Sequence, residues 1–72
     1  MTFPADARPG MAVRWVGAEY RDPAGVVRLG DVGTFIDFDG PDRDTAEVVV
    51  TFPATGAFVA PREDVEVVAT AP

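Results

Sequence analysis

The chain has 72 residues, no cysteine, no histidine and a formal net charge of −6, from 12 carboxylates against 6 basic residues that are all arginine. Disulfides and thiolate chemistry are thereby excluded, the commonest general base and metal ligand is missing, and an acidic surface repels nucleic acid. The length allows one domain with a thin core. We therefore expect a protein that is not an enzyme and that needs no cofactor.

The two ends are expected to lie outside the domain: residues 1–8 as an N-terminal arm and 69–72, ATAP, as a frayed tail. No basic run precedes an apolar stretch near the N-terminus, and every apolar run is too short to span a membrane. These features predict a cytoplasmic protein with no membrane partner. The absence of lysine, serine, asparagine and glutamine indicates a high-GC coding sequence, from a bacterium or a phage.

The first predicted strand covers 11–16, MAVRWV. Alternation directs Val13 and Trp15 to the core and Arg14 to the outer face. For Trp15 the core is favoured over a partner-facing position, because the indole alternates with apolar neighbours. Arg14 and Trp15 are nevertheless candidate partner contacts, since arginine and aromatic residues anchor protein interfaces.

A long polar connection spans 17–31, with room for a short strand at 26–29. It carries Tyr20 and Arg21, which we assign to a partner-binding surface because loops on a rigid scaffold often carry such residues. Tyr20 either packs over the mouth of the domain or faces a partner, and the sequence does not decide between these positions. Replacing both residues by alanine is expected to weaken partner binding and to leave the melting temperature nearly unchanged.

The segment RLGDVGTFIDFDG, 28–40, joins two glycines to a predicted strand over 33–38. Gly30 and Gly33 are expected to be structural residues. Gly33 should have a positive φ, or lie where a neighbouring backbone comes too close for a side chain.

An acidic turn, DGPDRDT, follows at 39–45. Its carboxylates and their neighbours suggest calcium, which prefers clustered oxygen ligands. The EF-hand spacing is absent, however, because glycine is at the fourth position counted from Asp37, instead of the sixth, and proline follows it. A solvated hairpin tip is favoured, and no metal site is expected. The carboxylates concerned are Asp37, Asp39, Asp42, Asp44 and Glu47.

The strand EVVVTF, 47–52, is the most β-prone segment of the chain. Alternation directs Val48, Val50 and Phe52 to the core. The rest of the chain is predicted to be a tight turn at 53–56, a strand at 57–60, one turn of 3₁₀-helix at 61–64 and a last strand at 65–68. Phe58 in the penultimate strand is a further candidate partner contact.

The segments RPGMAVRWV, GDVGTFIDFD, EVVVTF and FVAPREDVEVV follow in an order that resembles bacterial SH3-like small β-barrels. Gly30, Gly33 and Phe35 are similar to the Gly-x-x-Gly-x-apolar step of the KOW-type barrels of ribosomal and transcription proteins. The order is similar also to photosystem I subunit IV and the variable chain of ferredoxin–thioredoxin reductase. The resemblance implies an all-β, five-stranded SH3-like barrel over 9–68, with a long first loop and a 3₁₀ turn before the last strand.

Because one fold hosts many functions, the resemblance implies only an interaction or accessory module. The first hypothesis is a non-catalytic domain that binds another protein, of unknown identity. Its candidate contacts are Arg14, Trp15, Tyr20, Arg21 and Phe58. The alternatives are a KOW-like nucleic-acid-associated module, which the acidity opposes, and an acidic mimic of DNA that binds a basic partner.

Overall fold

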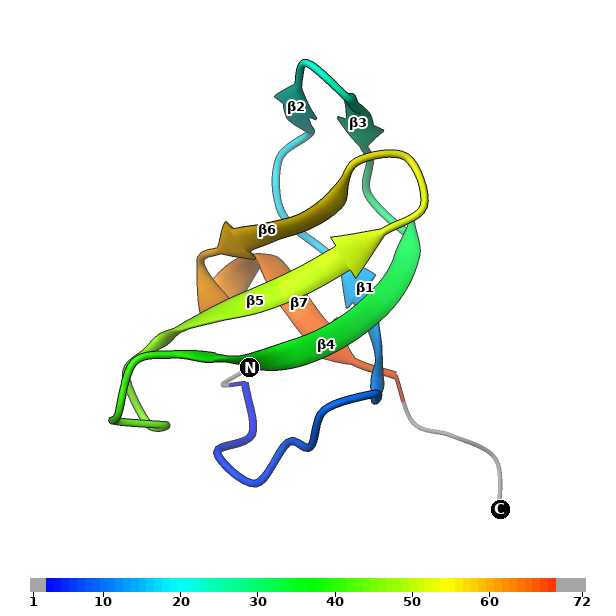
Figure 1. Ribbon diagram of the computed structural model, residues 1–72. Helices are drawn as coiled ribbons and strands as arrows, with labels where there is room; N and C mark the ends of the chain where they lie inside the picture. The colour runs from blue at the N-terminus through cyan, green and yellow to red at the C-terminus, as the bar shows by residue number, and fades with distance from the viewer. Residues whose placement is uncertain (1–2, 69–72) are drawn as a thin grey trace.

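Seven strands and one 3₁₀ turn make up the regular structure of residues 3–68, the part of the chain that the computed structural model describes (Figure 1). The elements are β1 (Ala12–Trp15), β2 (Tyr20–Asp22), β3 (Gly25–Val27), β4 (Val32–Asp39), β5 (Glu47–Phe52), β6 (Gly56–Ala60), η1 (Arg62–Asp64) and β7 (Val65–Val67). The protein is all-β, as predicted. The predicted tail, 69–72, lies outside the described residues.

Five of the strands form one antiparallel sheet in the order β6-β5-β4-β1-β7. The long strand β4 pairs with β1 through its first half and with β5 through its second half, and Figure 1 shows it curving between them. The end strands β6 and β7 share no ladder within residues 3–68, and η1 connects them. The sheet therefore curls around the core, and its ladder does not close into a continuous barrel.

The connection predicted over 17–31 contains a small hairpin, β2–β3, that stands apart from the sheet (Figure 1). Asp22 pairs with Gly25 across the turn. The Asp22 Oδ1 atom accepts hydrogen bonds from the amides of Ala24 and Gly25 at 2.8 and 3.1 Å. An aspartate that bonds its own downstream backbone stabilises a turn. The predicted short strand is therefore β3, and it begins and ends earlier than expected.

Most of the core residues lie on the inner face of the curled sheet, and the hairpin adds Val27. In β5, Val48, Val50 and Phe52 are buried, as the alternation predicts. The complete set of buried apolar residues is Phe3, Ala7, Val13, Trp15, Val27, Phe35, Phe38, Val48, Val50, Phe52, Ala60 and Val65.

A β-bulge interrupts the alternation of β4. The register against β5 shifts between Phe35 and Asp37, so that Ile36 and Asp37 are both exposed. Phe35 and Phe38, three positions apart, are consequently both buried. A bulge inserts one unpaired residue and bends the strand, which helps one strand to serve two halves of the curled sheet.

The N-terminal arm predicted over 1–8 belongs to the core from Phe3 onward. Phe3 and Ala7 are buried, and the Phe3 ring lies 5.4 Å from the Phe35 ring and 5.9 Å from the Phe38 ring, measured between centroids. The separation of arm from domain was therefore wrong at these residues. A small domain has too few apolar residues to leave a phenylalanine outside its core.

Arg62 holds three separate segments together. Its guanidinium donates hydrogen bonds to the carbonyl oxygens of Phe3 at 2.8 Å, Arg43 at 2.9 Å and Ala46 at 3.0 Å. A charged donor makes hydrogen bonds that are stronger than neutral ones. The first residue of η1 therefore attaches the N-terminal segment and the β4–β5 turn to the sheet.

Candidate interaction surface

Three of the five predicted contact residues meet in one aromatic cluster. The rings of Tyr20 and Phe58 stack with their centroids 4.0 Å apart and their planes at 2°. Trp15 lies 6.1 Å from Tyr20 and 5.9 Å from Phe58. Trp15 is only 2% exposed, and its Nε1–H donates a hydrogen bond to the Ala18 carbonyl at 2.7 Å. The core position favoured for Trp15 is therefore confirmed.

Tyr20 packs over the end of the core and is half-buried. Its hydroxyl donates a hydrogen bond to the Asp22 carboxylate at 3.1 Å. Burial, together with this hydrogen bond, raises the pKa of Tyr20 above its ordinary value of 10.0. The two positions left open for Tyr20 are thereby resolved in favour of packing. Its removal is expected to destabilise the domain, contrary to the sequence-based expectation of an unchanged melting temperature.

The two predicted arginine contacts lie in separate exposed ion pairs. On the hairpin, Arg21 pairs with Glu19 at 2.6 Å, and the hydrogen bond from Arg21 holds the pKa of Glu19 below its ordinary value of 4.5. On the outer face of the sheet, Arg14 pairs with Glu66 at 3.4 Å. Exposed pairs of this kind contribute little to stability. The structure therefore does not gather the five predicted contacts into one site.

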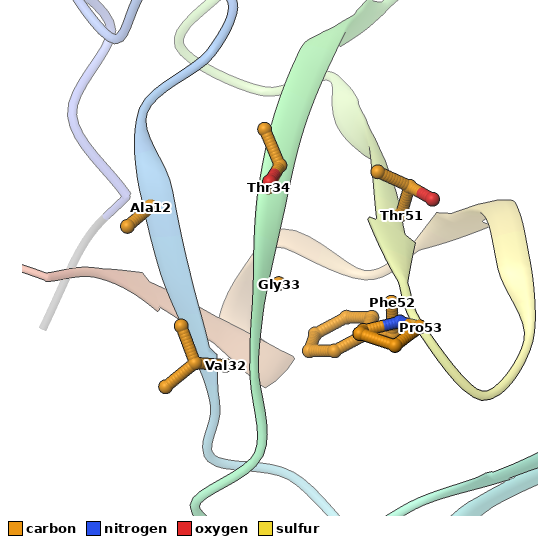
Figure 2. A pocket seen from close by; sticks show the side chains of 7 residues that line it. All are labelled: Ala12, Val32, Gly33, Thr34, Thr51, Phe52 and Pro53. Carbon is orange, nitrogen blue, oxygen red and sulfur yellow. The ribbon is translucent and has the colours of Figure 1, made fainter.

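A shallow groove of about 450 Å³ lies instead on the outer face, where β4 and the end of β5 diverge (Figure 2). A second depression of about 220 Å³ shares its Val32, Phe52 and Pro53 walls and extends to Asp31 and Ala54. Val32 is 54% exposed at the groove. The residues that line the larger groove are Ala12, Val32, Gly33, Thr34, Thr51, Phe52 and Pro53.

The groove begins where the β4–β5 ladder ends. The last pair at this end is Thr34 with Thr51, and continuing the register would place Val32 opposite Pro53. Proline has no N–H and cannot donate to a ladder, so β5 ends and the chain turns away. Pairing of Phe52 with Gly56 then returns the chain as β6.

Gly33 allows the close packing below the groove. A Cβ atom at this position would lie 2.7 Å from the Phe52 ring and would also overlap the Thr51 carbonyl oxygen. Of the two reasons expected for this glycine, the close approach therefore applies, and φ is not positive. Gly30 differs, because its φ of 93° is the feature that requires glycine there.

Of the groove residues, the sequence analysis named Gly33 as a structural residue and assigned Phe52 to the core. Val32 and Pro53 were missed as surface residues. The available signal was a proline directly after a strongly β-prone strand, because such a proline leaves the edge of the neighbouring strand unpaired.

A hydrogen bond within the acidic turn stabilises its conformation. Asp42 Oδ1 accepts a hydrogen bond from the Asp44 amide at 2.9 Å, and the Arg43 guanidinium lies 5.7 Å from the centre of the Phe38 ring. Within residues 3–68, no three acidic side chains are grouped as metal ligands. In the same part of the chain, no helix is long and apolar enough to cross a membrane.

Comparison of the chain with protein-family models, with curated proteins and with solved structures finds no match. The resemblance to SH3-like barrels therefore stays a prediction. The surface itself has to supply the argument for function.

Proposed function

We propose that this chain is a small non-catalytic interaction module of the SH3-like barrel type, which binds another protein through the groove between β4 and the end of β5. The observation that carries the proposal is the apolar groove beside the half-exposed side chain of Val32. Exposed apolar concavities commonly mark binding sites. The missing histidine, cysteine, serine and lysine support the non-catalytic part, because few groups are left to act as nucleophile or general base.

Charge favours a basic partner segment. The chain carries a net charge of −6, and Asp31 lines the depression that continues the groove. Complementary charge accelerates encounter and suppresses binding of like-charged partners. A segment that places apolar side chains in the groove, with lysine or arginine next to them, fits both features.

The nucleic-acid alternative is weaker because four of the six arginines make polar contacts within the protein. Arg14, Arg21 and Arg28 contact carboxylates, and Arg62 bonds backbone carbonyls. Phosphate binding would have to compete with these contacts and with the net negative charge.

The test is affinity capture from a lysate of the encoding organism, with quantitative mass spectrometry. We expect Val32→Asp to lose a protein that the wild type recovers. Ile36→Asp is the matched control, because Ile36 is also an exposed β-branched residue of β4, but lies outside the groove. Equal recovery by both variants would contradict the proposed surface.

A titration with labelled DNA and RNA at low salt separates the alternatives. Binding that weakens steeply with salt would favour the nucleic-acid module. Capture of a basic DNA-binding protein independently of Val32 would favour DNA mimicry. Neither outcome is expected.

A further inference from the structure

The strand β6 forms one end of the sheet and pairs on one side only. Figure 1 shows it beside β5, and β5 is the strand that pairs with it among the described residues. The exposed side chains of Ala57 and Val59 lie on the outer face, and Val59 is 47% exposed. An exposed edge strand offers its main-chain N–H and C=O groups to another strand.

The register shows which main-chain groups are offered. Phe35 bonds toward β1, through its amide to the Met11 carbonyl at 2.8 Å. Because the main-chain groups of successive residues point to opposite sides of a strand, Thr34 bonds toward Thr51 of β5.

The same alternation applies in β5 and β6. Val50 and Phe52 bond toward Phe58 and Gly56, their partners in β6. The N–H and C=O groups of Ala57 and Val59 consequently point away from the sheet. No hydrogen bond to these four groups is found in the part of the chain that the structure describes.

Charge distinguishes this edge from the opposite one. The eight residues 53–60, PATGAFVA, contain no charged side chain, although 25% of the chain is charged. The other edge strand, β7, is only three residues long, contains Glu66 and follows the charged η1 turn. Short length and charge are the usual protection of an edge against pairing. β7 has this protection and β6 lacks it.

We propose that β6 pairs with β6 of a second copy of this chain, antiparallel and across a two-fold axis at Phe58. In this register Ala57 lies opposite Val59 of the second copy, and the two pairs exchange four main-chain hydrogen bonds. The pairing places apolar side chains beside one another and no like charges opposite. The edge is separate from the groove, so this inference does not depend on the proposed function.

The dimer is weak and depends on concentration. Two short strands bury less surface than the roughly 1,200–2,000 Å² of a stable complex. Each copy also carries a charge of −6, so the copies repel one another at low salt. Salt screens this repulsion, and the association strengthens as the ionic strength rises.

Sedimentation equilibrium over a range of protein concentrations and salt tests the proposal. Val59→Lys should weaken self-association by about tenfold or more, because an edge lysine opposes strand pairing. Ile36→Lys is the control: Ile36 is 38% exposed and lies outside the groove, and the charge change is the same, but β4 is an interior strand. Thermal unfolding verifies that both variants fold. A monomer at every concentration and salt, or an equal effect of both variants, would overturn the proposal.

Cysteine substitutions test the register, because the natural chain has no cysteine. Under mild oxidation, a mixture of Ala57→Cys and Val59→Cys should form the mixed disulfide faster than either variant forms its own. Directly opposite Cβ atoms are about 4.5–5.5 Å apart, whereas diagonal ones are farther away. If the mixed disulfide has no advantage over the two homodisulfides, the two-fold register at Phe58 is wrong.

Discussion

Gly33 shows how one residue without a side chain keeps β4 and β5 in contact. Its missing Cβ leaves the space that the Phe52 ring and the Thr51 carbonyl occupy. Gly33→Val should reduce the free energy of unfolding by about 1–3 kcal/mol, because an overpacked core shifts its side chains and backbone. Urea unfolding measures the change.

Gly30→Ala is the comparison for Gly33→Val. A Cβ at Gly30 meets no atom within 4 Å, so only the positive φ of 93° penalises the substitution. The Gly30 variant should therefore lose less stability than the Gly33 variant. A Gly33→Val protein that unfolds at the wild-type urea concentration but no longer binds its partner would make Gly33 a recognition residue instead.

The ionisation of Tyr20 can be measured without overlap from another residue, because Tyr20 is the one tyrosine of the chain. Burial and the Asp22 hydrogen bond favour its neutral form in the folded protein and raise its pKa above 10.0. The resulting stabilisation is present below the pKa of the unfolded chain and is lost as the pH rises through the folded pKa. The midpoint of the rise in tyrosinate absorbance should therefore lie above pH 10.0, and Asp22→Asn should lower the pKa of Tyr20 in the folded protein. Titration at or below the ordinary value in a folded protein would contradict the buried position.

Among the elements, η1 contributes more to the stability of the fold than its three residues suggest, because Arg62 donates hydrogen bonds to three carbonyl groups. Arg62→Met keeps much of the aliphatic length but removes the donors. It should cost about 2 kcal/mol or more, since hydrogen bonds from a charged group contribute more than neutral ones. Guanidinium chloride unfolding measures this loss.

Arg43→Met is the control for Arg62→Met, because the Arg43 guanidinium lies over the Phe38 ring and the residue is exposed. An exposed cation–π contact is worth about 0.5–1 kcal/mol. Equal losses in the two variants would show that Arg62 does not connect the segments.

Several strands of the sheet could be predicted because their apolar residues have a period of two. β5 is the best case, with Val48, Val50 and Phe52 buried in turn. The bulge in β4 could not be predicted, since it depends on where β4 leaves β1 and joins β5. Burial of Phe3 was also not predictable from local pattern, because its partners Phe35 and Phe38 are distant in sequence.

For the whole molecule, the sequence identified aromatic residues that meet in the fold, but it did not identify the residues of the groove. Trp15, Tyr20 and Phe58 were chosen as aromatic contacts, and the fold uses them mainly to pack the end of the core. The groove at Val32 and Pro53 lies where the β4–β5 ladder ends, and the register shows which residues of β4 it exposes. Sequence patterns describe single strands, whereas the groove depends on how two strands diverge.

The most direct measurement is photo-crosslinking from single cysteine positions, which the cysteine-free chain permits. Val32→Cys, Ile36→Cys and Arg21→Cys are each labelled with a benzophenone maleimide and irradiated in a lysate of the encoding organism. Position 32 should give discrete adducts with a partner protein, because it lies in the groove, whereas positions 36 and 21 lie outside it. Adducts from position 21 alone would return the contact surface to the hairpin. No adduct from position 32, or equal adducts from positions 32 and 36, would contradict binding through the groove.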